Sequence, residues 1–387
     1  MWMLISIFIL LSYTLINIYN GIKILALIRY FFPLFRAVYF WPVFIFLCYS
    51  MILVFVFRLN IFHSLRNAAL FQIPAMLYLC FSLLILSVLL AVIKITGIVN
   101  ITPGLYAVRT GIALVVTVMI MIYGHFHAKD IKTVHYSVSL NTANVNQETG
   151  NTLRIALIAD THIGGNTDKK WLARIVDTVN ETRPDIICLA GDVFDTDIRI
   201  MPDREAKIAE LRRLSAPLGV YAVPGNHDVD RIAFRDGGVT EGIREILENA
   251  GIVFLQDEVH LIDGKFYLIG RRDMSPIGGR QDRKSALELV EGLDKSMPFI
   301  VMDHQPMDYR NLEEAGADPI LSGHTHRGQF FPGNLATNII FRKAGALNHG
   351  HWKGPSAQGI ITSGAGVWGL VFRLGSNSEV VVIDVNL

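Results

Sequence analysis

The first 128 residues of this 387-residue chain contain no aspartate or glutamate, and no other feature of the sequence constrains its fold as strongly. Long uncharged apolar runs lie between isolated basic residues there, and a membrane-spanning helix needs about 20 such residues. The runs show no polar face, which argues against the buried helices of a soluble domain. We therefore expect a transmembrane region over residues 1–128, with four helices at about 1–22, 37–57, 67–93 and 110–126.

The net charge of +1 conceals a division of the chain into two parts. Residues 1–128 carry seven basic side chains, whereas the remainder holds 28 basic and 34 acidic side chains. The seven basic residues are isolated and form no patch that could follow a phosphate backbone, so we expect no nucleic-acid partner. The expected partner of this region is a lipid bilayer. Counted together with Lys129 and Lys132, the seven basic residues divide five to four between the loops on the two sides of the membrane, with Arg109 assigned to a loop. The side on which the remainder lies therefore stays open.

Residues 129–151 are expected to be a linker, because they include a polar, turn-forming run at 141–151. Residues 152–387 then alternate short apolar runs with amphipathic stretches, a pattern typical of a layered α/β domain. The last part, 359–385, is expected to form antiparallel strands that complete a second sheet. The other expected elements are strands at 153–159, 186–190, 220–223, 253–255, 267–270, 299–302 and 320–321, and helices at 170–182, 204–214, 240–249 and 284–293.

Five short motifs rich in carboxylate and imidazole groups each follow an expected strand directly. Loops at the carboxyl ends of the strands in an open α/β sheet converge, so we expect the motifs to meet. Their oxygen and nitrogen donors, without a thiolate, suit Mn, Fe, Zn or Mg. In Asp-x-His and His-x-His, residues i and i+2 point the same way on an extended segment and can reach one ion. The motifs are Asp160-Thr-His162, Gly191-Asp192, Gly225-Asn226-His227-Asp228, His304-Gln-Pro306 and Gly323-His324-Thr-His326.

This ordered set resembles the calcineurin-like metallophosphoesterase superfamily, and the resemblance covers about residues 152–387. The runs at 323–329 and 364–375 are similar to those of its bacterial membrane-associated branch, which has N-terminal transmembrane helices. The resemblance implies a four-layer α/β/β/α sandwich, here preceded by the four-helix transmembrane region. It also implies a multi-pass protein of the bacterial cytoplasmic membrane.

The resemblance further implies two divalent metal ions, with manganese expected first and iron, zinc or magnesium as alternatives. One aspartate would bridge the two ions, and one histidine would lie beside the leaving group. The residues carried over are Asp160, His162 and His326 for the first ion, Asn226, His304 and His324 for the second, Asp192 for the bridge, His227 for catalysis and Asp228 for orienting the His227 ring.

The sequence departs from the family after the bridging aspartate. Many soluble members have an asparagine and an arginine that reaches the phosphate there, whereas this chain has Val193-Phe194-Asp195. We expect phosphate contact from Arg271, Arg272 or Arg327 instead. The alternative for each is an ordinary solvated surface charge.

These observations favour a membrane-anchored phosphoesterase that acts on a phosphodiester, a phosphomonoester or a pyrophosphate. Two cations can hold the phosphate oxygens and share an attacking hydroxide, while His227 assists the leaving group. A phosphorylated substrate with a lipid portion is the preferred refinement, because four spans exceed what tethering requires. The alternative is a non-catalytic membrane module with a structural or sensory metal site. The oligomeric state stays open.

Overall fold

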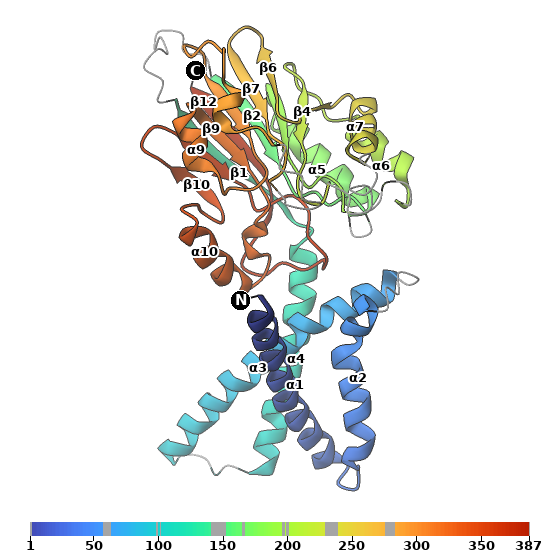
Figure 1. Cartoon of the computed structure of the whole chain (residues 1–387). Coiled ribbons are helices and arrows are strands. Elements are labelled where there is room, and N and C mark those ends of the chain that lie inside the picture. The colour runs from blue at the N-terminus through green and yellow to red at the C-terminus, as the bar shows by residue number, and fades with distance from the viewer. Residues whose placement is uncertain are drawn as a thin grey trace. The chain divides into compact units, whose positions relative to one another are not determined.

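The computed structural model divides the chain into two units, Met1–His125 and Phe126–Leu387 (Figure 1). Each unit has hydrophobic clusters of its own and is described by itself. The structure describes residues 2–56, 63–97, 100, 102–140, 152–164, 167–195, 198, 201–228, 239–274 and 283–386.

Four apolar helices begin the chain. Three contain a stretch that is long and apolar enough to span a membrane, namely Ile7–Phe31, Leu70–Thr96 and Pro103–His127. In the second helix Ala37–Ser50 counts as a shorter apolar segment, so the described residues support three spans rather than the expected four. The helices are α1 (Trp2–Phe31), α2 (Ala37–Val56), α3 (His63–Thr96) and α4 (Pro103–His127).

Arg109 lies inside α4 and not in the loop where the sequence placed it. The helix starts at Pro103, because proline is well tolerated in the first turn of a helix. The buried Arg109 guanidinium donates hydrogen bonds to the Ser87 hydroxyl, at 3.1 Å, and to the Thr110 hydroxyl, at 3.3 Å. These partners compensate for a charge within an apolar unit.

Two six-stranded mixed sheets form the centre of the second unit. The first sheet has the order β1 (Ile131–Ser139), β12 (Ser378–Asn386), β2 (Thr152–Ile158), β3 (Ile186–Ala190), β4 (Val220–Val223) and β5 (Val253–Phe254). The second has the order β10 (Gly350–Lys353), β11 (Gln358–Ile361), β9 (Ala317–Ser322), β8 (Phe299–Met302), β7 (Phe266–Gly270) and β6 (Glu258–Ile262).

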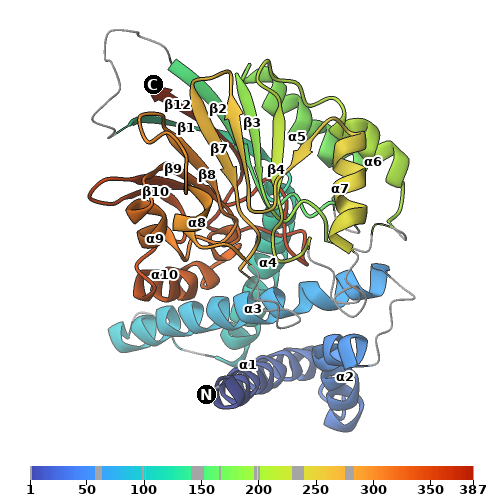
Figure 2. The ribbon, with the colours of Figure 1, turned by 45° about the horizontal axis from the view of Figure 1, so that its top comes forward.

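Alternating side chains of the strands face two different layers. In β2, Ile155 and Leu157 belong to the core between the sheets, whereas Ala156 and Ile158 pack with the helices on the outer face. Figure 2 shows helices on both outer sides of the paired sheets, which confirms the four-layer α/β/β/α fold. The helices are α5 (Lys169–Glu181), α6 (Arg204–Leu211) and α7 (Val239–Asn249) on the first sheet, α8 (Ala286–Leu289) and α9 (Tyr309–Glu314) on the second, and then α10 (Gly333–Lys343) and the 3₁₀ helix η3 (His326–Gly328).

Two expectations about connectivity need correction. Residues 131–139, expected to be part of a linker, form β1, which pairs in parallel with β12 along its whole length. The rest of that expected linker, 141–151, lies outside the described residues. The strand β12 belongs to the first sheet, antiparallel to β2, and of the expected C-terminal strands only β11 joins the second sheet. A local apolar pattern identifies a strand but does not select its sheet.

Replacing Val138 of β1 by aspartate should destabilise the domain strongly. Val138 is fully buried in the core between the sheets, whereas its neighbour Ser137 is exposed. Burying an uncompensated carboxylate costs several kcal/mol, of the same order as the whole stability of a domain, about 5–15 kcal/mol. Val138→Asp should lower the thermal unfolding temperature of the detergent-solubilised chain, and Ser137→Asp should not. Equal unfolding temperatures for the two variants would contradict the assignment of β1 to the core.

Candidate metal centre

The five motifs lie where five strands end, and the structure brings them together. The loops after β2, β3, β4, β8 and β9 carry the side chains, so residues up to 166 positions apart share one site. Two groups of three side chains have ligand atoms within 4.8 Å of one another and contain only residues predicted as ligands. The first cluster is Asp160, His162 and His326, and the second cluster is Asp192, His304 and His324.

The backbone of these loops is strained at the residues that carry the chemistry. Asp160, His162, Asp192, His324 and His326 all have positive φ angles, between 45° and 71°. Residues other than glycine adopt this left-handed conformation at a cost of about 1–3 kcal/mol, and they keep it only where the surroundings enforce it. The surrounding sheets and loops therefore hold the side chains in positions that an isolated loop would not favour.

Two motif glycines are required because the loops approach each other closely. A Cβ atom on Gly225 would lie 2.1 Å from Oδ1 of Asp192, and one on Gly323 would lie 2.4 Å from Oδ2 of Asp160. Atoms cannot approach so closely, so any side chain at either position would displace a carboxylate of the site. The glycines of Gly-Asn-His and Gly-His thus have a packing reason in addition to their preference for turns.

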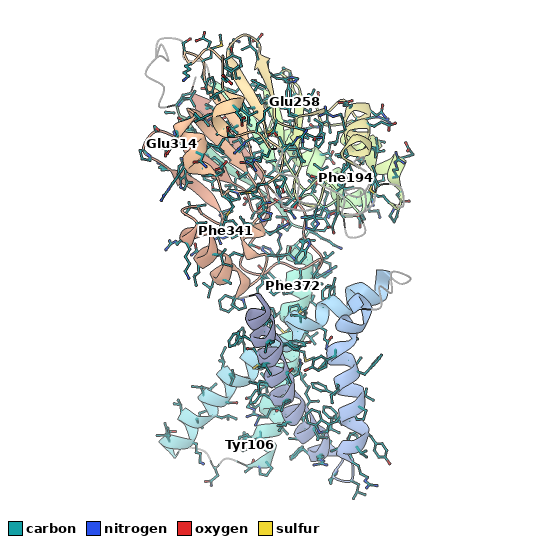
Figure 3. The ribbon with its side chains drawn as sticks, viewed as in Figure 1. Tyr106, Phe194, Glu258, Glu314, Phe341 and Phe372 are labelled. Atoms are coloured by element: carbon teal, nitrogen blue, oxygen red, sulfur yellow. The ribbon has the colours of Figure 1, made fainter. Side chains whose placement is uncertain are left out.

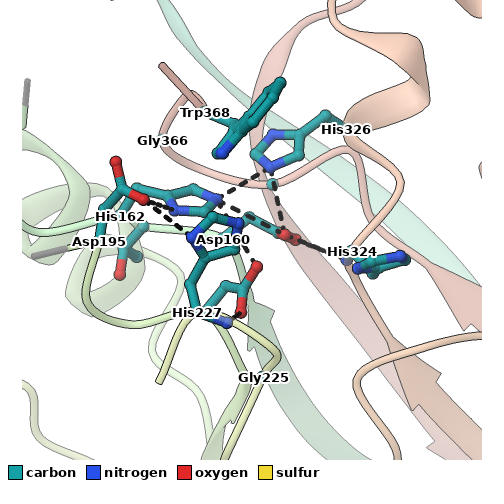
Figure 4. Close-up of polar contacts among 12 residues, drawn as sticks. Asp160, His162, Asp195, Gly225, His227, His324, His326, Gly366 and Trp368 are labelled. Carbon is teal, nitrogen blue, oxygen red and sulfur yellow. Dashed lines mark hydrogen bonds and ion pairs between the residues drawn. The ribbon is translucent and has the colours of Figure 1, made fainter. Parts of the chain in front are cut away.

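The first cluster joins two nearly parallel imidazoles to one carboxylate (Figure 4). Nε2 of His162 lies 3.0 Å from Nε2 of His326, and Nε2 of His326 lies 3.3 Å from Oδ1 of Asp160. Burial lowers the pKa of His326 well below its ordinary value, so that ring is neutral and keeps a lone pair. Two ring nitrogens and a carboxylate oxygen therefore converge on one point.

In the second cluster, the backbone fixes which nitrogen of His304 faces the other ligands. Nδ1 of His304 donates a hydrogen bond to the Ala190 carbonyl at 2.8 Å, because a carbonyl oxygen can only accept. Nε2 is then directed to Oδ2 of Asp192, at 3.3 Å. Burial also lowers the pKa of His324 to about 3. Oδ1 of Asn226, predicted as a further ligand, is buried and has no hydrogen-bond partner among the described residues.

Asp192 connects the two clusters through a single oxygen. Its Oδ2 lies 3.3 Å from Nε2 of His304 and 3.8 Å from Nε2 of His162, which belong to different clusters. Its other oxygen, Oδ1, accepts a hydrogen bond from the backbone N–H of His227 at 2.8 Å. This hydrogen bond fixes the carboxylate with Oδ2 directed between the clusters.

The donor set fits a pair of divalent cations. Burial raises the pKa of Asp160 to about 6, so its charged form is costly without a nearby positive charge. Burial alone would also raise the pKa of Asp192, but attraction to His304 and His162 keeps it well below its usual range. Two buried carboxylates, facing ring nitrogens and the unpartnered amide oxygen of Asn226 form a site that favours positive charge.

His227 is positioned by Asp195 and not by the residue predicted for that role. Nδ1 of His227 lies 3.0 Å from Oδ1 of Asp195. The carboxylate of Asp228 accepts backbone hydrogen bonds from Val193, Phe194 and Gly225 instead, and so it holds loops together. Burial would lower the pKa of His227, but Asp195 and Asp192 raise it above its ordinary value. The ring is therefore poised to carry a proton.

Two of the arginines predicted to contact phosphate are engaged elsewhere. Arg271 is buried, and its Nη1 lies 2.9 Å from Asp303 and 2.7 Å from Asp308. The backbone N–H of Arg272 donates to Asp257, and its side chain lies 3.7 Å from the same carboxylate. Arg327 directly follows His326 and is half-buried, so its role stays a prediction.

Three residues near the site had no assigned role in the sequence interpretation. Asp195 belongs to the Gly191–Asp195 loop and lies three positions after Asp192, a spacing that could have identified it. Trp368 brings its ring centroid to 6.3 Å from that of His227 (Figure 4). Arg373 is fully buried and donates to the carbonyls of Ser363 and Gly366, at 2.7 Å each, so it supports the loop that carries Trp368.

Comparison with known proteins agrees with this site. Residues 153–328 match the family model described as calcineurin-like phosphoesterase. An uncharacterized metallophosphoesterase of Helicobacter pylori (strain ATCC 700392 / 26695) is 32% identical over 237 residues, which cover 60% of this chain and 59% of that protein. A Danio rerio protein named transmembrane protein with metallophosphoesterase domain is 28% identical, over 71% of this chain and 62% of that one.

A further relative matches over nearly its whole length. The uncharacterized metallophosphoesterase YkoQ of Bacillus subtilis (strain 168) is 25% identical, over 71% of this chain and 98% of that protein. In contrast, the match spans only about three fifths of the Helicobacter protein. The family match and these relatives lead to one assignment: residues 153–328 form a calcineurin-like phosphoesterase domain.

Proposed function

We propose that this chain is a membrane-anchored phosphoester hydrolase that works with two divalent cations. The observation that supports the proposal most is the position of Asp192 Oδ2, 3.3 Å and 3.8 Å from imidazoles of the two clusters. When bound, two divalent cations supply positive charge that holds phosphate oxygens and lowers the pKa of water. In this proposal Asp192 is shared, and the other ligands are Asp160, His162 and His326 for one ion and Asn226, His304 and His324 for the other.

His227 is proposed to donate a proton to the leaving oxygen. Its pKa is raised by Asp195 and Asp192, and its ring is partly exposed, with 26% of the side chain accessible. A histidine that carries a proton near neutral pH is suited to this task. Asp195 holds the ring by Nδ1, so Nε2 is the nitrogen that would give up the proton.

The membrane anchor is proposed from the three long apolar helices and the absence of acidic residues from the first 128 positions. A relative named as a transmembrane protein with this domain supports the same arrangement. We propose a multi-pass protein of the bacterial cytoplasmic membrane whose substrate carries a lipid portion. An acid-free membrane region would tolerate the anionic headgroups of such a substrate.

Asp192→Asn should reduce both metal binding and hydrolysis. Asparagine keeps an oxygen that can accept from the His227 N–H but removes the charge that two cations would share. The full-length variant should bind fewer Mn²⁺ ions per chain, by elemental analysis, and should lose hydrolysis of bis-(p-nitrophenyl) phosphate. Asp384→Asn on β12, whose carboxylate pairs with Arg154 at the surface, is the matched control. Full metal content together with full rate in Asp192→Asn would contradict the proposal.

His227→Ala should lower kcat more for substrates whose leaving group is more basic, because such a leaving group needs a proton to depart. A positioned acid contributes typically ~10²–10⁴-fold, and a p-nitrophenolate leaving group needs that acid least. The variant should therefore lose far more activity on an alkyl phosphoester than on a p-nitrophenyl ester. Steady-state kinetics on the two substrates, with metal content measured in parallel, provide the test.

Asp195→Asn serves as the companion variant for the same prediction. Removal of the carboxylate should lower the pKa of His227, so the protonated acid is lost at a lower pH. The alkaline limb of the pH profile of kcat should then move to lower pH. An equal loss on both leaving groups in His227→Ala, with an unmoved alkaline limb in Asp195→Asn, would exclude His227 as the acid.

The lipid refinement predicts a dependence on the membrane region that soluble substrates do not share. Full-length protein in mixed micelles should hydrolyse a lipid-linked phosphoester with a higher kcat/KM than a truncated chain beginning at Phe126, where the second unit starts. Both forms should hydrolyse bis-(p-nitrophenyl) phosphate at similar rates. An equal kcat/KM of the two forms on lipid-linked substrates would eliminate the refinement and leave the hydrolase proposal intact.

A further inference from the structure

Helix α10 (Gly333–Lys343) presents an unusual exposed apolar face in the second unit. Leu335, Ile339 and Ile340 are 52%, 57% and 58% exposed. Ile339 lies four positions after Leu335, which places these two on one side of the helix, and Ile340 follows Ile339 directly. The last turn carries Arg342 and Lys343, both exposed. Phe341 alone in the helix is buried, with its ring centroid 6.3 Å from that of His324. The helix therefore packs toward the metal centre and directs apolar side chains to the outside.

The sequence around α10 is free of acidic residues. No aspartate or glutamate occurs at positions 319–378, and five basic residues do: Arg327, Arg342, Lys343, Lys353 and Arg373. Apart from the N-terminal region, no other stretch of the chain has this composition over such a length. An apolar helix face flanked by exposed basic residues is the pattern that binds in the interface of an anionic bilayer.

The segment 374–378 makes hydrogen bonds both to the end of α4 and to the residue just ahead of α10. His127, the last residue of α4, has Nε2 3.2 Å from the Ser376 carbonyl, and the Ser378 hydroxyl donates to the Ala128 carbonyl at 2.7 Å. Two residues before Ser376, the carbonyl of Leu374 accepts the backbone N–H of Phe331, just ahead of α10. Phe341 of α10 and Phe372, just before this segment, are marked in Figure 3 at the same end of the unit. The last residue of α4, which belongs to the second unit, and the start of α10 are therefore both hydrogen-bonded to the segment 374–378.

An exposed aromatic side chain, Trp368, lies between this region and the site. Trp368 is 57% exposed, and its ring approaches His227. The amide of Gln329, at the end of η3, donates to the carbonyls of Trp368 and Leu370 and accepts from the N–H of Trp368. The segment 329–332 thus joins α10 to the loop that borders His227. Tryptophan is favoured at the level of lipid headgroups.

We infer that the face of Leu335, Ile339 and Ile340 on α10, with Arg342 and Lys343 at its end, lies in the headgroup region of an anionic bilayer. This inference rests on the membrane anchoring proposed above and adds a second contact with the membrane, beside the metal centre. Such a contact holds His227 and both clusters at the lipid surface, where the phosphate of a lipid-linked substrate resides. The occupant is the lipid bilayer, selected by the basic charge around the helix and by the hydrogen bonds that tie His127, the last residue of α4, to the segment that also holds the start of α10.

The test measures the contact of α10 with lipid and requires neither metal nor turnover. Full-length Ile340→Cys is labelled with an environment-sensitive nitrobenzoxadiazole dye in nanodiscs that contain phosphatidylglycerol and headgroup-level doxyl lipid. The native Cys48, Cys80 and Cys188 are buried. Leu261→Cys is the matched control, because Leu261 is 50% exposed and its strand β6 lies far from α10 in the same unit (Figure 1). Doxyl quenching should be several-fold greater at position 340 than at position 261.

The charge contribution is tested in the same preparation. Exchange of phosphatidylglycerol for phosphatidylcholine, or Arg342→Glu with Lys343→Glu, should reduce the quenching at position 340. Equal quenching at positions 340 and 261 would overturn the inference. A blue shift of the dye emission that grows with protein concentration, without quenching by the doxyl lipid, would also overturn the inference. It would identify a second copy of the chain as the occupant. Incorporation into nanodiscs reports the anchor separately, and kinetics report the hydrolase.

Discussion

The site depends on the burial of two carboxylates among four imidazoles. Asp160 and Asp192 are 0% and 2% exposed, and the ring nitrogens of His162, His304 and His326 lie within 4 Å of one or both of them. Carboxylates at such a depth require positive charge, and two divalent cations would supply it while accepting the lone pairs of the neutral rings. The glycines beside the carboxylates and the left-handed conformations of the loops follow from the need to bring these groups together.

The sequence predicted which motifs would meet, because the geometry of parallel strands determines where their following loops lie. Motifs that follow β2, β3, β4, β8 and β9 must meet, since the carboxyl ends of such strands share one edge. The four-layer arrangement followed from the resemblance to the superfamily, whereas most strands and helices were predictable from their apolar patterns. These features depend on local pattern, and local pattern is what a single sequence records.

Features that depend on long-range partners were missed. The polar-looking segment at 131–139 is a strand only because β12, some 250 residues later, pairs with it. Asp195 and Asp228 are both carboxylates near His227, and only the folded loops show that Asp195 contacts the ring while Asp228 binds backbone N–H groups. Arg271 resembled a phosphate ligand until its buried pairing with Asp303 and Asp308 was visible. In each case several residues of the same type compete for one role.

The central claim is that one oxygen of Asp192 is shared by the two cations. Magnetic coupling between the bound ions tests this claim most directly. Two Mn²⁺ ions held by one carboxylate oxygen interact magnetically, whereas ions in separate sites do not. Electron paramagnetic resonance of the full-length, Mn²⁺-loaded protein should show the multiline spectrum of a coupled pair, and Asp192→Asn should abolish it. A spectrum of isolated Mn²⁺ ions in the unaltered protein at full loading would contradict the account.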